Sequence, residues 1–233
     1  MGLAPAVYPV PVWRSRFPWL VHGTTGRAGE FDLGLFGTVP AGEGMDRWAA
    51  LRARVELPRA VHGKQVHGRR VMEHGDGPAG LFVTQGVDGH VTGERGVLLT
   101  VSVADCVPIS LVDPERRRVA LLHGGWRGTA AGIMAAGLER LGSPPSKLHA
   151  HLGPAICGAC YEVGPEVHEA LGVPIPDGNT PVDVRAVQAW QLVGAGVPPA
   201  RITVSEHCTR CGEGFYSHRA GDSGRQVGIL GTR

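Results

Sequence analysis

The segment Val119-Ala-Leu-Leu-His-Gly-Gly-Trp-Arg-Gly-Thr129 sets the architecture that the rest of the chain supports. Its short apolar run is typical of a buried strand bounded by charged residues on one side and glycines on the other. His123 ends this strand, and the alanine-rich residues 130–141 predict a helix that Thr129 opens. A strand, a glycine-rich turn and a helix point main-chain N–H groups at an anion, and Arg127 lies in the turn. The segment predicts an anion-binding turn or, alternatively, a tight connection without a ligand.

A second strand is predicted just upstream, over residues 96–103, and it runs into Ala104-Asp105-Cys106-Val107-Pro108. Because Pro108 has no N–H, the ladder of hydrogen bonds is interrupted near Cys106. The ends of two neighbouring strands therefore carry a thiol, Cys106, and an imidazole, His123. This pair fits a nucleophile with its general base or two ligands of one metal ion. A buried cysteine that only packs is the third alternative.

The composition is that of an ordinary globular protein, with 233 residues of which 42% are apolar. No linker, repeat or low-complexity tract divides the sequence, so we expect residues 1–233 to form a single domain. The net charge is only +2, and the densest basic run, Arg116-Arg117-Arg118, follows Asp113-Pro114 as in an exposed turn. We therefore expect no nucleic-acid partner.

The sequence gives no indication of a membrane segment or of export. It has no run of about 18 apolar residues, as a membrane-spanning helix would need. Residues 1–20 lack the charged region and apolar core of a secretory signal. The five cysteines, an odd number, do not suggest a disulfide framework. We expect reduced thiols, a cytoplasmic location and no membrane partner.

The predicted elements alternate irregularly along the chain. Strands are predicted at residues 17–25, 81–83, 96–103, 119–122, 148–152, 202–204 and 226–230, a strand or a bent strand pair at residues 60–71, and helices at residues 47–54, 130–141, 165–171 and 182–193. Several neighbouring strands have the pattern of hairpins. The sequence therefore predicts an α/β or α+β domain with mixed β-sheets flanked by helices, and not a doubly wound sheet.

Five short motifs occur in register: QVHG at Gln65–Gly68, ADCVP at Ala104–Pro108, HGGWRG at His123–Gly128, GPAI…YEVG at Gly153–Gly164, and CT…YSHR…GR at Cys208–Arg225. In this order they resemble the YfiH-like, laccase-domain purine nucleoside phosphorylases, over a match from about Phe17 onward. The resemblance implies a mixed α/β fold. It also implies phosphorolysis of adenosine, inosine and methylthioadenosine to the free base and ribose 1-phosphate or its methylthio analogue, with adenosine deamination beside it. Polyphenol oxidation with copper has also been attributed to the family.

The resemblance further implies a zinc centre, with copper as the alternative metal, ligated by His67, Cys106 and His123. A second VHG places His62 five residues before His67. We assign the ligand to His67 because Gln65 precedes it at the family's spacing. One thiolate and two imidazoles leave the fourth position of a tetrahedral zinc open, as in catalytic sites. An open position allows the metal to activate water for attack on C6 of adenine.

Phosphorolysis needs a phosphate held near C1′ and a stabilised oxocarbenium-like transition state, which are tasks of positioning and electrostatics. Arg127 with the start of the following helix, and Arg219 with His218, are the candidate phosphate-binding groups. Asp105 and Glu162 are the candidate proton donors or acceptors, with a surface or helix-capping role as the alternative.

Two other chemistries are weighed against this one. A metal-free cysteine hydrolase would use Cys106 as nucleophile and His123 as base. A multicopper laccase would need several His-x-His pairs, whereas the eleven histidines give one, His149-Ala-His151. The zinc-deaminase signature H-x-E…P-C-x-x-C is absent, because Ile156 precedes Cys157, so deamination would need a differently built site.

Two Cys-x-x-Cys pairs, Cys157 with Cys160 and Cys208 with Cys211, resemble zinc knuckles. The 47 residues between the pairs exceed the usual spacing of a knuckle site. We therefore interpret them as free thiols, with a second, structural metal as the alternative.

Overall fold

A computed structural model gives the fold and describes residues 6–28, 32–36 and 39–233. One six-stranded sheet contains β1 (Val7–Tyr8), β2 (Leu20–Thr25), β3 (Arg59–Lys64), β5 (Gly80–Gln85), β7 (Val97–Val103) and β14 (Gln226–Thr232). A second contains β4 (Val71–Glu73), β6 (Gly89–Thr92), β8 (Val107–Asp113), β9 (Arg118–Gly124), β10 (His149–Leu152) and β13 (Ile202–Val204). The short strands β11 (Glu162–Val163) and β12 (Thr180–Pro181) form a separate pair. The helices are α1 (Pro11–Arg16), α2 (Ala41–Val55), α3 (Trp126–Ala131), α4 (Ile133–Leu141), α5 (Pro165–Leu171) and α6 (Val184–Gly194).

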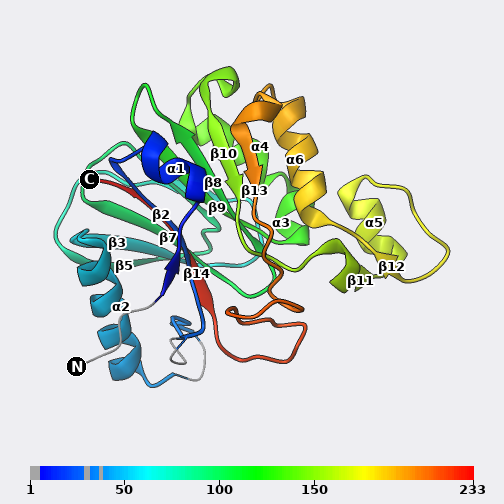
Figure 1. The fold of residues 1–233 in the computed structure, drawn as a ribbon, viewed down its shortest axis with the longest axis horizontal. Coiled ribbons are helices and arrows are strands. Elements are labelled where there is room, and N and C mark those ends of the chain that lie inside the picture. The colour runs from blue at the N-terminus through cyan, green and yellow to red at the C-terminus, as the bar shows by residue number, and fades with distance from the viewer. Residues whose placement is uncertain (1–5, 29–31, 37–38) are drawn as a thin grey trace.

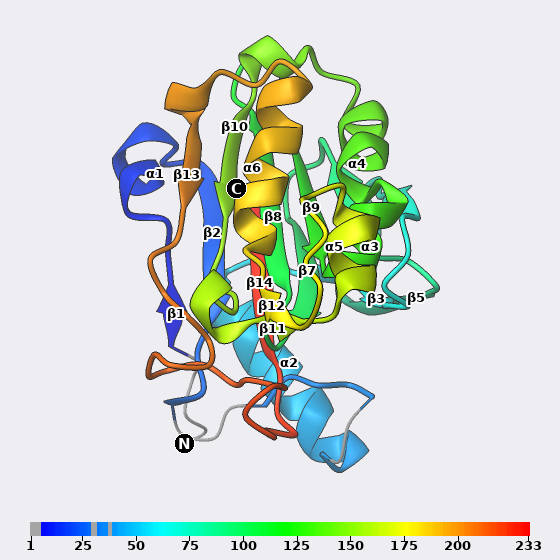
Figure 2. The ribbon, with the colours of Figure 1, turned by 90° about the vertical axis from the view of Figure 1, so that its right-hand side faces the viewer.

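The strand order is β1-β2-β14-β7-β3-β5 in the first sheet and β13-β10-β8-β9-β6-β4 in the second. Both sheets are mixed, because β3 runs parallel to β5 and β7, and β10 runs parallel to β13, while β8 and β9 form an antiparallel hairpin. The sheets face each other, with α2 outside the first and α4 and α6 outside the second (Figures 1 and 2). The predicted mixed sheets flanked by helices are confirmed.

The alternation of side chains along β7 explains this layering. Val97, Leu99 and Val101 join the core between the two sheets, while Leu98 points to the opposite face and packs with Trp48 of α2. Successive residues of a strand face opposite sides of the sheet. A strand with apolar side chains on both faces must therefore be covered on both sides. The strand β9 follows the same rule, because its alternate residues pack against the helices outside the second sheet.

The single helix predicted over residues 130–141 is instead two helices, α3 and α4. The break is at Gly132, whose φ of 89° is in the left-handed region that favours glycine. The first of the two helices begins at Trp126, so Thr129 lies inside it and does not open it. The Thr129 hydroxyl oxygen accepts a hydrogen bond of 2.8 Å from Gln188 Nε2 of α6.

Other predicted elements agree in part. Helix α5 has the predicted bounds, and α6 begins after Asp183, whose carboxylate accepts bonds from two main-chain N–H groups as an N-cap. Helix α2 begins six residues before the predicted start. Of the two alternatives for residues 60–71, a single strand or a bent strand pair, the structure shows the pair: β3 and β4, joined by a bend. The loop predicted over residues 26–37 lies partly outside the described residues.

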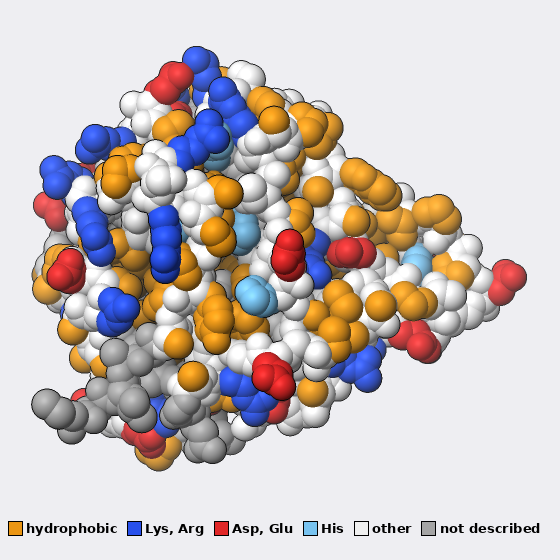
Figure 3. Space-filling view, viewed as in Figure 1, with side chains coloured by type: hydrophobic (Ala, Val, Ile, Leu, Met, Phe, Trp, Pro, Cys, Tyr) orange, Lys and Arg blue, Asp and Glu red, His pale blue; other side chains and the backbone are white. Residues whose placement is uncertain are grey.

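Among the residues that the structure describes, no helix is both long and apolar enough to cross a membrane. On the face seen in Figure 3, the basic side chains lie mostly toward the left and upper left, with acidic, apolar and uncharged groups between them. The densest basic run lies in the β8–β9 turn, where Asp113 accepts hydrogen bonds from the main-chain N–H groups of Glu115 and Arg116. This is the exposed turn that the sequence predicts.

Candidate functional site

Three predicted ligands meet at one end of the two-sheet core. Cys106 immediately precedes β8, and His123 lies on the antiparallel strand β9, opposite Pro108. His67 lies in the bend between β3 and β4, with a φ of 59°. The Sγ atom and one nitrogen of each imidazole all lie within 4.8 Å of one another. The structure therefore brings together the residues that the motifs predict.

Asp88, in the turn between β5 and β6, organises this cluster and is fully buried. One carboxylate oxygen accepts a hydrogen bond of 3.0 Å from Nδ1 of His123, which leaves Nε2 as the ligand nitrogen. The same carboxylate accepts hydrogen bonds from the main-chain N–H groups of Val66, His67 and Gly68, at 3.1, 2.9 and 3.0 Å. One buried acid thus fixes both histidines.

No sequence motif singles out Asp88. Its signal is an acidic residue in a Val-Asp-Gly turn between two short apolar strands, a pattern that also fits an ordinary exposed turn. Only the tertiary fold places this turn beneath His67 and His123. Residues that act through another side chain carry little local signature.

The ionisable groups of the cluster shift one another's pKa values in favour of their charged forms. Burial alone would raise the pKa of the Cys106 thiol, but the neighbouring His123 and His67 imidazoles lower it to about 6. Burial would lower the pKa of His123, whereas the Cys106 thiolate and Asp88 raise it to about 9. The pKa of Asp88 is lowered from its usual value because the hydrogen bonds from His123 and the main chain outweigh burial. The sulfur is therefore ready to act as an anionic ligand or nucleophile.

The glycines of the HGGWRG segment give the cluster its close packing. A Cβ added to Gly125 would lie 2.9 Å from Sγ of Cys106 and 3.2 Å from Cδ2 of His67. A Cβ on Gly124 would lie 2.5 Å from Nε2 of Gln188. The glycines are needed because their neighbours approach closely, and not for a left-handed conformation. The thiolate, the two imidazoles and this cradle fit a metal ion with three protein ligands.

The cluster lies in the wall of a cavity of about 600 Å³, a size in the range of small-molecule sites. The predicted Asp105, Arg127, His218 and Arg219 line it together with the three ligands. The aromatic side chains of Phe36, Trp126 and Tyr161, the polar Gln65 and Ser102, and His62 line it as well and were not predicted as site residues.

Asp105 joins the cluster to the C-terminal loop. Its φ is 83°, its Oδ1 accepts a 2.6 Å hydrogen bond from the Thr209 hydroxyl, and its Oδ2 accepts one of 2.7 Å from the Arg219 main-chain N–H. Both carboxylate oxygens are therefore engaged in holding the chain that carries Arg219. This favours a positioning role for Asp105.

Glu162, the other predicted carboxylate, is exposed and does not line the cavity. What it contributes is its main-chain carbonyl, which accepts a 2.8 Å hydrogen bond from Nη1 of Arg219. The Arg219 guanidinium carbon also lies 5.0 Å from the centre of the Tyr161 ring. Glu162 thus anchors a candidate phosphate-binding residue through its backbone.

Arg127 lies in the first turn of α3 and is exposed at the cavity. Its guanidinium carbon lies 4.3 Å from the centre of the Trp126 ring. Because α3 has only six residues before the break at Gly132, an anion would be held here mainly by the guanidinium. The predicted contribution of a long helix that starts at Thr129 is therefore wrong.

His62 occupies a different environment from His67. Its ring is 1% exposed, and Nδ1 lies 2.9 Å from the Thr100 hydroxyl, which itself donates to the Val61 carbonyl. Thr100 must therefore accept from His62, so Nδ1 carries the hydrogen. Burial lowers the pKa of His62 to about 4, against a smaller raising effect of Thr100. His62 is a neutral wall residue, while His67 is the histidine in the cluster.

Comparisons with known proteins agree with this geometry. Residues 42–233 match the family model described as multi-copper polyphenol oxidoreductase laccase. The chain is 39% identical over 202 residues to purine nucleoside phosphorylase YlmD of Geobacillus stearothermophilus, a match that covers 76% of this chain and 73% of that protein. It is 38% identical over 204 residues to adenosine deaminase RL5 from an unknown prokaryotic organism, covering 79% and 76%.

Two solved structures share the whole architecture. The hypothetical protein YfiH of Bacillus licheniformis superposes with a TM-score of 0.89 at 28% identity, covering 99% of this chain and 97% of that one. The YlmD structure from Geobacillus stearothermophilus superposes with a TM-score of 0.86 at 33% identity, covering 93% of each chain.

Proposed function

The chain belongs to the laccase-like YfiH family, and we propose that it is a zinc-dependent purine nucleoside phosphorylase acting on adenosine, inosine and methylthioadenosine, with adenosine deamination as a side activity. One observation carries the proposal. The cavity that holds His67, Cys106 and His123 also presents Arg127 and Arg219, so that three potential metal ligands and two guanidinium groups suited to an anion share one chamber.

The lining suits the two parts of a nucleoside reaction. Trp126 and Tyr161 offer aromatic faces to a purine base, and a planar base gains from stacking of this kind. Arg127, Arg219 and His218 offer hydrogen-bond donors to phosphate. A guanidinium binds phosphate in a charge-assisted and often bidentate manner. We assign the base to the aromatic side chains and the phosphate to the two arginines.

In the proposed reaction, a phosphate oxygen forms a bond to C1′ while the bond from C1′ to the base nitrogen breaks. The proton that the hydrogen phosphate loses ends on the base nitrogen, so the products are the free base and ribose 1-phosphate. The residues contribute mainly by positioning: the arginines hold the phosphate, and Asp105 holds the loop that carries Arg219. A zinc ion held by the cluster would supply Lewis acidity at its open position.

A turnover assay of the purified protein tests the proposal. Adenosine, inosine and methylthioadenosine are supplied with and without inorganic phosphate, and the bases and sugar phosphates are separated by chromatography. We expect free base and ribose 1-phosphate only when phosphate is present, and slow formation of inosine from adenosine in either case. Free base without sugar phosphate would indicate hydrolysis, and no turnover of any nucleoside would contradict the proposal.

A metal-free cysteine hydrolase is the second candidate, because Asp88, His123 and Cys106 form the chain of orienting acid, base and nucleophile that such enzymes use. The second imidazole, His67, favours the metal, since a hydrolase would need only one. Iodoacetamide separates the two. A metal-bound thiolate should resist alkylation until a chelator is added, whereas a free catalytic thiolate should react at once.

Copper-dependent polyphenol oxidation is the alternative suggested by the family description. Within the described residues, the groups of three or more potential ligands are the three-ligand cluster and a set of four cysteines. Neither provides the paired histidines that a four-copper centre requires. Metal analysis, together with dioxygen uptake in the presence of a phenol, tests this alternative directly.

A further inference from the structure

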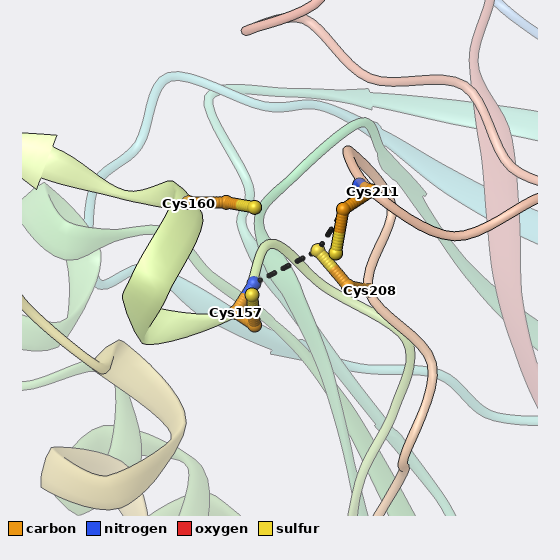
Figure 4. A group of neighbouring side chains, drawn as sticks. All are labelled: Cys157, Cys160, Cys208 and Cys211. Carbon is orange, nitrogen blue, oxygen red and sulfur yellow. Dashed lines mark hydrogen bonds between the residues drawn. The ribbon is translucent and has the colours of Figure 1, made fainter.

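Four of the five cysteines form a second cluster. Cys157, Cys160, Cys208 and Cys211 present sulfur atoms that all lie within 4.8 Å of one another, and none of the four lines the cavity. Figure 4 shows the four side chains pointing inward from two turns that face each other. No disulfide links them. The fold has therefore gathered four thiols at one point, outside the lining of the cavity described above.

Each pair is presented by a tight turn. The Cys160 N–H donates to the Cys157 carbonyl at 3.0 Å, and the Gly212 N–H donates to the Cys208 carbonyl at 3.1 Å. A Cβ on Gly212 would lie 2.5 Å from that same carbonyl oxygen, so only glycine fits directly after the second pair. Both pairs thus have the Cys-x-x-Cys turn in which two thiolates converge on one ion.

Main-chain N–H groups also point at one of the sulfurs. Sγ of Cys208 accepts hydrogen bonds from the N–H groups of Cys157, at 3.2 Å, and Cys211, at 3.5 Å. The first of these bonds crosses from one turn to the other, next to a bridge between Ala155 and Cys208. Such N–H groups orient and stabilise an anionic sulfur ligand, as outer partners of a metal site do.

We propose that Cys157, Cys160, Cys208 and Cys211 bind one zinc ion in a closed, structural site. Tetrahedral zinc with Zn–S bonds of about 2.3 Å places its sulfurs about 3.8 Å apart, so the observed cluster needs to contract by only about 1 Å. Soft thiolates in a tetrahedral set select zinc or iron over hard cations. Four protein ligands leave no open position, which distinguishes this site from the three-ligand cluster.

The wide spacing in sequence is no obstacle, because the intervening chain returns to its starting point. The strand β13 pairs parallel to β10, and the segments that follow these two strands carry the two Cys-x-x-Cys pairs. The interpretation of the cysteines as free thiols rested on the 47 residues that separate the two pairs in the sequence. Because the parallel pairing of β10 and β13 brings the two pairs together, this separation does not exclude a shared ion.

The proposed ion would hold one wall of the cavity together. Tyr161 follows Cys160 directly, and Thr209 follows Cys208 and donates to Asp105. Arg210 Nη1 also donates to the Cys160 carbonyl at 2.9 Å. A zinc ion at this point ties the loop that carries Tyr161 to the loop that carries Thr209 and leads to Arg219, so it acts as a positioning element.

The test begins with the variant His67→Ala/Cys106→Ala, in which two ligands of the other cluster are removed. Elemental analysis of this variant, purified without chelators, should find about one zinc per chain. Adding Cys160→Ser and Cys211→Ser should lower the content to less than about a tenth. The matched control is the wild-type chain, which should hold one more equivalent than the two-residue variant.

Cobalt(II) provides a second readout that does not depend on the folding of the serine variants. The His67→Ala/Cys106→Ala chain, stripped of metal and loaded with cobalt(II), should give sulfur-to-cobalt charge-transfer bands and the visible bands of a tetrahedral all-thiolate site. Absence of metal with four reactive thiols, a disulfide found by mass spectrometry without reduction, or iron in place of zinc would each overturn the assignment.

Discussion

The two sulfur-containing clusters of this chain differ in what surrounds them. The cluster of His67, Cys106 and His123 combines nitrogen and sulfur donors and opens into a cavity lined by aromatic and basic side chains. The four-cysteine cluster contains sulfur only and lies between two tight turns outside that cavity. We call the first the open cluster, because three protein ligands would leave one coordination position of a bound metal ion free, and the second the closed cluster, because four would leave none.

The comparison shows that the chemistry of a metal site depends both on the number of its protein ligands and on the residues that contact those ligands. The open cluster is supported by Asp88, which orients His123 and the loop carrying His67. The closed cluster is supported by N–H groups of its own turns. With metal ions bound, the outer partners of the open cluster would tune a reactive centre, and those of the closed cluster would hold two loops together.

The largest effect is expected from loss of a ligand at the open cluster. His67→Ala should remove about one equivalent of metal and abolish nucleoside turnover, while the four-cysteine cluster keeps its metal. His62→Gln is the matched control, because His62 is also a VHG histidine but lies outside the cluster, and it should retain both equivalents. Metal content by elemental analysis decides. A greater loss in the His62 variant would mean that the register of the ligands is misassigned.

The next effect separates anion binding from metal binding within the open site. Arg127→Ala should raise the phosphate KM or lower kcat/KM for phosphate by about 10- to 150-fold, since a charge-assisted bond contributes roughly 1.5–3 kcal/mol. Arg127→Lys should restore part of this, because an ammonium lacks the planar fork. Metal content should not change.

Initial rates against phosphate concentration measure this effect, with Arg116→Ala as control, because Arg116 is an exposed arginine in the β8–β9 turn. Adenosine deamination should suffer far less than phosphorolysis, because it uses water. Equal loss of both activities with the fold intact would instead assign Arg127 to the nucleoside.

The sequence predicts much of the open cluster because each ligand is part of a local pattern. Cys106 and His123 lie at strand ends that apolar runs reveal, and the family's motif selects His67 over His62. The position of Asp88 does not follow from any local pattern, since its role depends on β6 pairing with β9 in one register. The break at Gly132 is missed because an alanine-rich run satisfies helix propensity on both sides of it.

For the closed cluster, the sequence shows the candidate ligands but does not show that they meet in the fold. Both Cys-x-x-Cys pairs are visible in the sequence, but their convergence requires the return of the chain through α5, α6 and β13. Propensity and spacing contain no information on that return. The same holds for Glu162, where a motif residue acts through its carbonyl while its side chain remains in solvent.

A smaller effect is expected from a change in Asp88, the buried carboxylate that supports the open cluster. Asp88→Asn keeps the size of the side chain but replaces one acceptor oxygen by a donor that faces main-chain N–H groups. We expect about a 10- to 100-fold loss of zinc affinity or turnover, as for other carboxylates behind a ligating histidine. Zinc titration against a competing chelator measures it.

Asp113→Asn is the control for Asp88→Asn, because Asp113 is also a buried carboxylate that accepts two main-chain N–H groups, in the turn between β8 and β9. It should lower the free energy of unfolding without changing zinc affinity. Similar losses of affinity in both variants would mean that Asp88 supports the fold and not the metal.

The smallest effect concerns the free energy of unfolding at acid pH. The neutral His62 in the cavity wall contributes to it. Its pKa is about 4 in the folded chain, mainly because of burial, and 6.5 is the ordinary value. Between these values the unfolded chain binds more protons than the folded chain. The contribution of His62 is therefore complete above pH 6.5 and is lost as the pH falls toward 4, with a slope of up to about 1.4 kcal/mol per pH unit.

His62→Gln should remove this contribution, so the free energy of unfolding should fall less steeply between pH 6 and pH 5 than in the wild type, by up to about 1.4 kcal/mol. The pKa is also about 4 for His22, His74, His149 and His151, and burial lowers the pKa of His90 well below its ordinary value, so these histidines keep a remaining slope. Urea unfolding at several pH values measures it. Parallel pH profiles for wild type and His62→Gln would contradict this, because they would mean that the pKa of His62 is the same in the folded and the unfolded chain.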